Sequence, residues 1–131
     1  MLDGVTKTLP ALIRAEKLQN RAARHSFDWP DVEPVFSKVE EELAEVRETC
    51  RSGDREHIRE EIGDLLFVAV NLARHLDVEP GSALRAANDK FSRRFRCIEQ
   101  CLARQERSLS NATLLELDAL WDAAKRVLSK T

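Results

Sequence analysis

Apolar side chains recur along most of this chain at intervals of three and four residues, the period of an α-helix with one buried face. The clearest stripes are Val35, Val39, Leu43 and Val46 in one segment and Leu114, Leu117, Trp121, Ala124 and Leu128 in another. Short groups rich in Asp, Ser, Gly and Pro separate the stripes. The pattern predicts five helices near residues 9–24, 31–50, 54–76, 80–102 and 113–128.

The expected helix starts carry residues that suit them. Pro34 falls in a first turn and Pro80 at a first helical position, where the missing N–H costs nothing. Thr113 and Glu116 have the spacing of a capping box. Because the links are short, neighbouring helices should pack antiparallel. We therefore expect an all-α antiparallel bundle of about five helices, forming one domain over residues 1–131.

Composition supports this fold class and narrows the function. The 131 residues include four Gly, four Pro and no Tyr, a balance that favours helices. A net charge of -2 gives no global attraction to nucleic acid, so stable nucleic-acid binding is not expected. Charged residues interrupt the first thirty positions, which argues against a signal peptide or membrane span. We expect a cytoplasmic protein with reduced cysteines.

Two predicted helices each present a pair of carboxylates. Glu42 and Glu45 are three residues apart, as are Glu61 and Asp64, so each pair shares one side of its helix. Glu42 borders the apolar stripe, whereas Glu41 should face solvent. Mg²⁺ prefers carboxylate oxygens together with water and phosphates. The alternative is that these acids form solvated helix faces paired with nearby arginines.

Asp64 distinguishes the two interpretations. It is the only ionisable residue between Ile62 and Ala73, in a predicted helix whose sequence is apolar around most of its circumference. A lone buried carboxylate is costly unless a cation compensates it. A di-iron site is disfavoured, because no Glu-x-x-His element is present.

Two further pairs have the chemistry to meet a nucleotide. Lys90 and Arg94 lie one helical turn apart and could hold phosphates, or they could belong to a solvated basic surface. Trp121 and Lys125 could stack on a base and contact a phosphate, although a Trp on an apolar face is usually core. Neither pair alone identifies a ligand.

The order of motifs resembles a known family. Glu41-Glu42-Leu43-Ala44-Glu45 followed by Glu61-Ile62-Gly63-Asp64 is similar to the paired EExxE and ExxD motifs of the MazG nucleotide pyrophosphohydrolases. Similar blocks extend towards both ends, at residues 9–12, 27–29, 70–75, 87–95 and 121–125. The chain most resembles the C-terminal, catalytic domain of tandem MazG proteins.

The resemblance implies an all-α homodimer that hydrolyses nucleoside triphosphates. Mg²⁺, replaceable by Mn²⁺, would be bound by the four acids Glu42, Glu45, Glu61 and Asp64. The substrate would be contacted by Lys90, Arg94, Trp121 and Lys125. Water would attack the α-phosphorus and release pyrophosphate and a nucleoside monophosphate. The competing hypothesis is a non-enzymatic helical module that binds a partner protein.

Overall fold

The structure is a computed structural model that describes residues 2–128. Its α-helices are α1 (Ala11–Ala23), α2 (Glu33–Cys50), α3 (Arg55–His75), α4 (Pro80–Arg104) and α5 (Leu114–Leu128), with a short 3₁₀ helix, η1 (Leu109–Asn111), before α5. The five expected helices are confirmed, and the described part of the chain contains no strand. None of its helices combines the length and hydropathy needed to cross a membrane.

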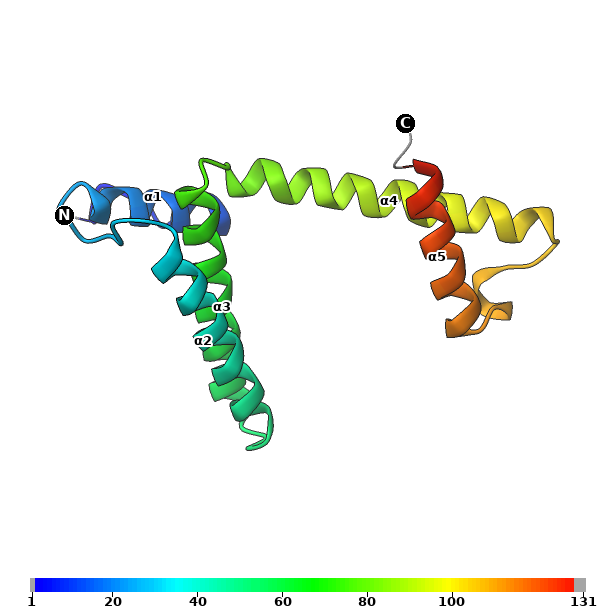
Figure 1. The fold of residues 1–131 in the computed structure, drawn as a ribbon, viewed down its shortest axis with the longest axis horizontal. Coiled ribbons are helices and arrows are strands. Elements are labelled where there is room, and N and C mark those ends of the chain that lie inside the picture. The colour runs from blue at the N-terminus through cyan, green and yellow to red at the C-terminus, as the bar shows by residue number, and fades with distance from the viewer. Residues whose placement is uncertain (1, 129–131) are drawn as a thin grey trace. The chain divides into compact units, whose positions relative to one another are not determined.

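Internal contacts divide the chain into two compact units, and the boundary along the sequence falls between Ala83 and Leu84. The first unit holds α1, α2, α3 and the first turn of α4. Within it, α2 and α3 form an antiparallel pair joined by a short turn, and α1 packs on α3 (Figure 1). The second unit holds the rest of α4 with η1 and α5.

The turn between α2 and α3 is fixed by local backbone chemistry. Gly53 has a φ of 71°, in the left-handed region that glycine adopts without a steric penalty. Asp54 follows as the N-cap of α3, and its side chain accepts a hydrogen bond from the backbone N–H of His57 at 3.3 Å. This turn sets the register of α2 against α3, and the register determines which acids meet.

The core of the first unit is small. Val5, Val35, Val68 and Val70 are its buried aliphatic residues. The expectation that α3 is buried around most of its circumference is wrong. Its residues Leu66 and Phe67 are 58% and 47% exposed, because α1 and α2 cover only part of the helix.

The second unit has its own buried residues, Ile98, Leu102 and Ala124. Helix α5 crosses α4 (Figure 1), and Trp121 of α5 contacts the Phe91 ring of α4 with centroids 5.3 Å apart. At the start of α5 the backbone N–H of Glu116 donates to the Thr113 hydroxyl at 3.1 Å, as expected of a cap.

Candidate metal centre and adjoining cavity

Three of the four expected ligands converge between α2 and α3. Glu42 and Glu45 are on α2 and Glu61 is on α3, and one carboxylate oxygen of each lies within 4.8 Å of the others. The i, i+3 spacing brings the α2 pair to one side of that helix, and the antiparallel packing brings Glu61 opposite. The sequence therefore predicted correctly that acids from two helices meet.

Two carboxylate oxygens in this cluster are buried without a partner. Glu42 is 7% exposed and Glu61 has a side chain 12% exposed. The Oε2 atom of each is buried, and no hydrogen-bond donor of the described residues reaches it. An unpaired buried carboxylate oxygen is unfavourable unless it has a donor or a cation. This donor set fits a hard divalent cation such as Mg²⁺.

The other oxygens of these two acids each contact a nitrogen-bearing side chain one helical turn away on the same helix. Lys38 Nζ lies 3.3 Å from Oε1 of Glu42, and His57 Nε2 lies 3.3 Å from Oε1 of Glu61. The hydrogen bond to Glu42 raises the pKa of Lys38, which keeps that ammonium charged. Each pairing fixes one oxygen of its carboxylate and leaves Oε2 for another ligand.

Glu45 is the exposed member of the cluster. A hydrogen bond shared with Glu61 is the main reason that its pKa is raised above 4.5, with desolvation and the negative charge of Glu61 acting in the same direction. Close carboxylates repel unless a proton or a cation lies between them. The shift therefore reports the crowding of negative charge that a divalent cation would relieve.

Asp64 departs from its predicted environment. It is exposed, so the argument that a buried lone carboxylate requires a cation does not hold for this residue. The reason is the partial covering of α3, which sequence periodicity cannot reveal. Asp64 also lies outside the group of three converging glutamates. It lines the same cavity as Glu42, so its role as a ligand stays a prediction.

That cavity has a volume of about 620 Å³ and lies within the first unit. Its lining combines acids, cations, amides and apolar side chains from the N-terminal segment, α1, α2, α3 and the loop between α1 and α2. The residues are Leu2, Leu18, Gln19, Ala22, Ser26, Phe27, Asp28, Trp29, Lys38, Glu42, Asp64, Phe67, Val68, Asn71 and Arg74.

Sequence reasoning did not assign roles to several of these lining residues. Gln19, Trp29 and Arg74 lie far apart along the chain, and only the fold brings them together. The contact of Lys38 with Glu42 could have been predicted from the sequence, because Lys38 lies one helical turn before Glu42 and opposite charges at that spacing pair.

The expected phosphate and base contacts belong to the second unit. Lys90 and Lys125 are exposed. The guanidinium carbon of Arg94 lies 5.4 Å from the centroid of the Trp121 ring, in a cation–π contact. Trp121 therefore packs against Phe91 and Arg94, which is the structural role that its sequence position also allowed.

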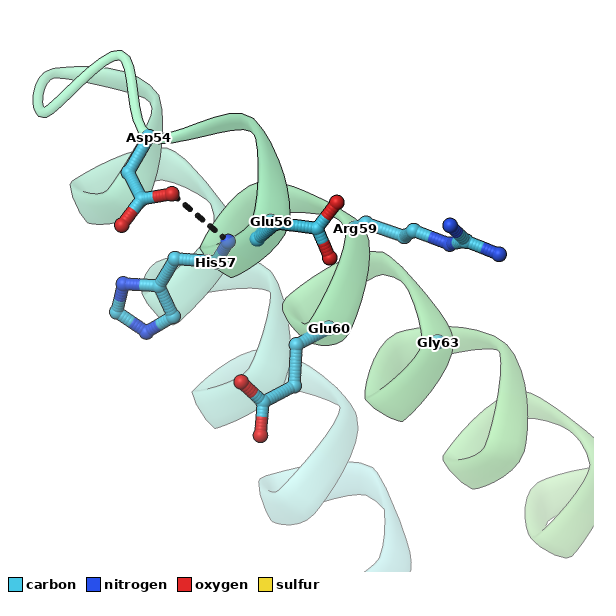
Figure 2. Close-up of a pocket in the computed structure, with 6 residues that line it drawn as sticks. All are labelled: Asp54, Glu56, His57, Arg59, Glu60 and Gly63. Carbon is cyan, nitrogen blue, oxygen red and sulfur yellow. Dashed lines mark hydrogen bonds between the residues drawn. The ribbon is translucent and has the colours of Figure 1, made fainter.

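A second hollow, also of about 620 Å³, lies at the start of α3. It is lined by Asp54, Glu56, His57, Arg59, Glu60 and Gly63. Figure 2 shows the Asp54 carboxylate turned towards the backbone nitrogen of His57, with Arg59 pointing away from both. Of its residues, His57 connects this hollow to the glutamates through its contact with Glu61.

The family model described as the MazG nucleotide pyrophosphohydrolase domain matches residues 32–97, which include the three converging glutamates and Asp64. The chain is 43% identical over 127 residues to the nucleoside triphosphate pyrophosphohydrolase of Escherichia coli strain K12. It is 41% identical over 124 residues to the nucleoside triphosphate pyrophosphohydrolase/pyrophosphatase MazG of Thermotoga maritima.

A third relative is an uncharacterized protein, YabN, of Bacillus subtilis, 44% identical over 126 residues. Each of the three alignments covers 95% of this chain. The chain spans 48% of the length of the first two relatives and 26% of the third. It thus corresponds to about half or less of each of these proteins.

Proposed function

Because this chain belongs to the MazG nucleotide pyrophosphohydrolase family, we propose that it hydrolyses nucleoside triphosphates in a reaction that depends on Mg²⁺. Water attacks the α-phosphorus, and the bond between that phosphorus and the oxygen bridging to the β-phosphorus breaks. The products are a nucleoside monophosphate and pyrophosphate. Two relatives are named as enzymes of this class.

The observation that carries the proposal is the pair of buried, unpartnered oxygens on Glu42 and Glu61. With Glu45, these residues would hold the cation, and Asp64 would complete the set from the cavity wall. When bound, Mg²⁺ offsets the negative charge of the triphosphate and acts as a Lewis acid at the phosphoryl group. Mn²⁺, which has similar ligand preferences, should also support activity.

The remaining charges suit an anionic substrate. Lys38 keeps its positive charge on the cavity wall beside Glu42, where it can orient a phosphate oxygen. We assign phosphate contacts also to Lys90, Arg94 and Lys125, and a nucleotide contact to Trp121. Those four assignments rest on the resemblance of their segments to the family. The surroundings of Trp121 support a packing role equally well.

Assembly and cellular location form part of the same proposal. Exposed apolar side chains on α2 and α3, among them Leu43, Ile62 and Leu66, support a homodimer that covers them. The cysteines are free, which accords with a reducing cytoplasm.

The experiment is an assay of products from a panel of nucleoside triphosphates with Mg²⁺. Equal amounts of monophosphate and pyrophosphate are expected, and little product in the presence of EDTA. Glu61→Ala should lower turnover by at least about 100-fold, since loss of a ligand should cost more than loss of a residue that only orients one. Glu41→Ala, an equally acidic but exposed position, should retain turnover.

Two results would overturn the proposal. One is release of orthophosphate, which means cleavage at the terminal phosphate. The other is a folded Glu61→Ala protein with undiminished turnover, which would show that Glu61 does not hold the catalytic cation.

A further inference from the structure

His57 contacts a proposed cation ligand but takes no part in the proposed reaction. Its ring nitrogen Nε2 lies 3.3 Å from Oε1 of Glu61, one helical turn further along α3. The Glu61 side chain is 12% exposed, and its other oxygen, Oε2, is buried without a hydrogen-bond partner among the described residues. A carboxylate that is held at one oxygen keeps the direction of the other. The contact with His57 therefore limits where Oε2 of Glu61 points.

The same arrangement occurs on α2. Lys38 Nζ lies 3.3 Å from Oε1 of Glu42, again from a position one turn before the acid. Within the part of the chain that the structure describes, Oε2 of Glu42 is likewise buried and has no partner. Glu42 and Glu61 both belong to the cluster of converging carboxylates. Two antiparallel helices thus hold their buried glutamates by a nitrogen donor at the same spacing.

The two other proposed ligands have no donor at this spacing. Glu41 stands one turn before Glu45, and Glu60 stands one turn before Asp64. An ionised carboxylate accepts hydrogen bonds and cannot donate them. Glu45 and Asp64 are also exposed. The four acids therefore divide into two buried ligands that are held by a nitrogen donor and two exposed ligands that are not.

The start of α3 fixes the backbone of His57. Its N–H donates to Oδ1 of Asp54, the N-cap residue, at 3.3 Å (Figure 2). His57 therefore stands in the first turn of the helix, and its ring reaches Glu61 through few side-chain torsions. Little conformational freedom has to be lost for the ring to hold the carboxylate.

From these contacts we propose that His57 is a positioning residue for the divalent cation. Its Nε2–H donates to Oε1 of Glu61 and so keeps Oε2 available to the cation. Residues that hydrogen-bond a metal ligand orient that ligand and raise the affinity for the metal. The inference rests on the proposed function in one respect, namely that the cation binds at these glutamates.

Binding of Mn²⁺ alone, without nucleotide, tests this role, with the free ion counted by electron paramagnetic resonance. His57→Phe keeps a ring and removes the donor, so it should bind Mn²⁺ about 10-fold more weakly than the wild type. His57→Gln restores a nitrogen donor one turn before Glu61 and should recover most of the lost affinity. His25→Phe, the same change at an exposed position outside α3, should bind Mn²⁺ like the wild type.

Thermal unfolding in EDTA separates positioning from a structural role. His57→Phe should melt close to the wild-type temperature, because the His57 side chain is 51% exposed and the backbone bond to Asp54 does not involve it. If His57→Phe fails to fold, His57→Ala replaces it with the same expected loss of Mn²⁺ affinity, since alanine suits a half-exposed helical position.

Wild-type Mn²⁺ affinity in a folded His57→Phe or His57→Ala protein would overturn the proposal. Binding by His57→Gln as weak as that by His57→Phe would do the same, because the donor would then not matter. A Glu61→Ala protein that binds Mn²⁺ like the wild type would refute the cation site together with the role of His57. The expected changes in Mn²⁺ binding without hydrolysis of any nucleoside triphosphate would refute the proposed function alone.

Discussion

Glu61 has a buried oxygen, Oε2, that no donor of the described residues reaches, and it shares its other contacts with Glu45 and His57. Without a cation this arrangement brings negative charges together and opposes folding. Binding of Mg²⁺ to the folded protein should therefore stabilise it strongly. The same charges that make the metal-free protein less stable provide the metal affinity.

Thermal unfolding with and without Mg²⁺ measures this coupling. At Mg²⁺ concentrations about 100-fold above the dissociation constant, the melting temperature of the wild type should rise by roughly 5–10 °C. In EDTA, Glu61→Gln should melt at or above the wild-type temperature, because it removes one of the crowded charges. Its melting temperature should respond little to Mg²⁺. A lower melting temperature for Glu61→Gln in EDTA, with an unchanged Mg²⁺ response, would contradict this account.

At this scale the sequence predicted most of the acidic site. The i, i+3 spacing placed Glu42 and Glu45 together, and the apolar stripe correctly placed Glu42 at the core margin and Glu41 in solvent. The prediction that Asp64 is buried was wrong, because periodicity shows which side of a helix is apolar but not whether another element covers that side. The burial of Gln19 was not predicted, because it depends on a hydrogen bond to the backbone carbonyl of Phe67, 48 residues away in the sequence.

Among the elements, α3 carries a glycine where a helix former would be more stable. Gly63 lies in its middle, and a Cβ added there meets nothing within 4 Å. Gly63→Ala should therefore raise the free energy of unfolding by about 0.5–1 kcal/mol, through the lower entropy of the unfolded chain. Urea denaturation of the metal-free protein measures the change. Destabilisation would show that another element approaches this face closely.

The loop between α1 and α2 is attached to α3 by a titratable group. Burial alone would raise the pKa of Asp28, but the hydrogen bonds from Arg74 and His75 outweigh it and lower the pKa below its usual 3.8. A depressed folded-state pKa contributes stability that is fully present above 3.8 and is lost as the pH falls through the lower value.

Two measurements follow for this loop. Carboxylate NMR should give Asp28 a pKa below 3.8. Asp28→Asn should lose less stability than the wild type as the pH falls below 3.8, because the variant has no carboxylate to protonate. Equal acid sensitivity of the two proteins would show that the Asp28 contacts do not stabilise the loop.

The helix boundaries were predictable because they are set locally. Proline in the first turn of α2, Asp54 before α3 and Thr113 before α5 each define a start that the structure reproduces to within about two residues. The cavity was not predictable in this way, since its lining comes from the N-terminal segment, three helices and a loop. Residues with no periodic relation to one another meet there only after α1 has packed on α3.

For the whole molecule, the main consequence of the fold is the apolar surface that the single chain leaves exposed. Leu66 of α3 is 58% exposed and Leu43 of α2 is 49% exposed. If a second copy covers this surface, sedimentation equilibrium should give the mass of a dimer. Leu66→Glu should shift the equilibrium to monomer, since burying an unpaired charge at an interface is costly. A wild-type mass of 14.9 kDa at all concentrations would exclude the homodimer.

The division into two units also affects how the eight predicted site residues are assigned. The carboxylates all belong to the first unit and Lys90, Arg94, Trp121 and Lys125 to the second. The first unit contains the cluster of three glutamates, the charged Lys38 and a cavity lined partly by aromatic side chains. The proposed metal ligands therefore all come from one unit, and the whole chain can be assayed without knowing how the two units are arranged.

Hydrolysis in water enriched in ¹⁸O, with Mg²⁺ and a nucleoside triphosphate that the protein accepts, tests the central claim most directly. Attack of water on the α-phosphorus places one ¹⁸O atom in the nucleoside monophosphate and none in the pyrophosphate, and mass spectrometry distinguishes the two. The account predicts this distribution for the wild type. It also predicts that Glu61→Ala loses turnover and so forms little of either labelled product. Incorporation of ¹⁸O into pyrophosphate, or into released orthophosphate, would contradict it.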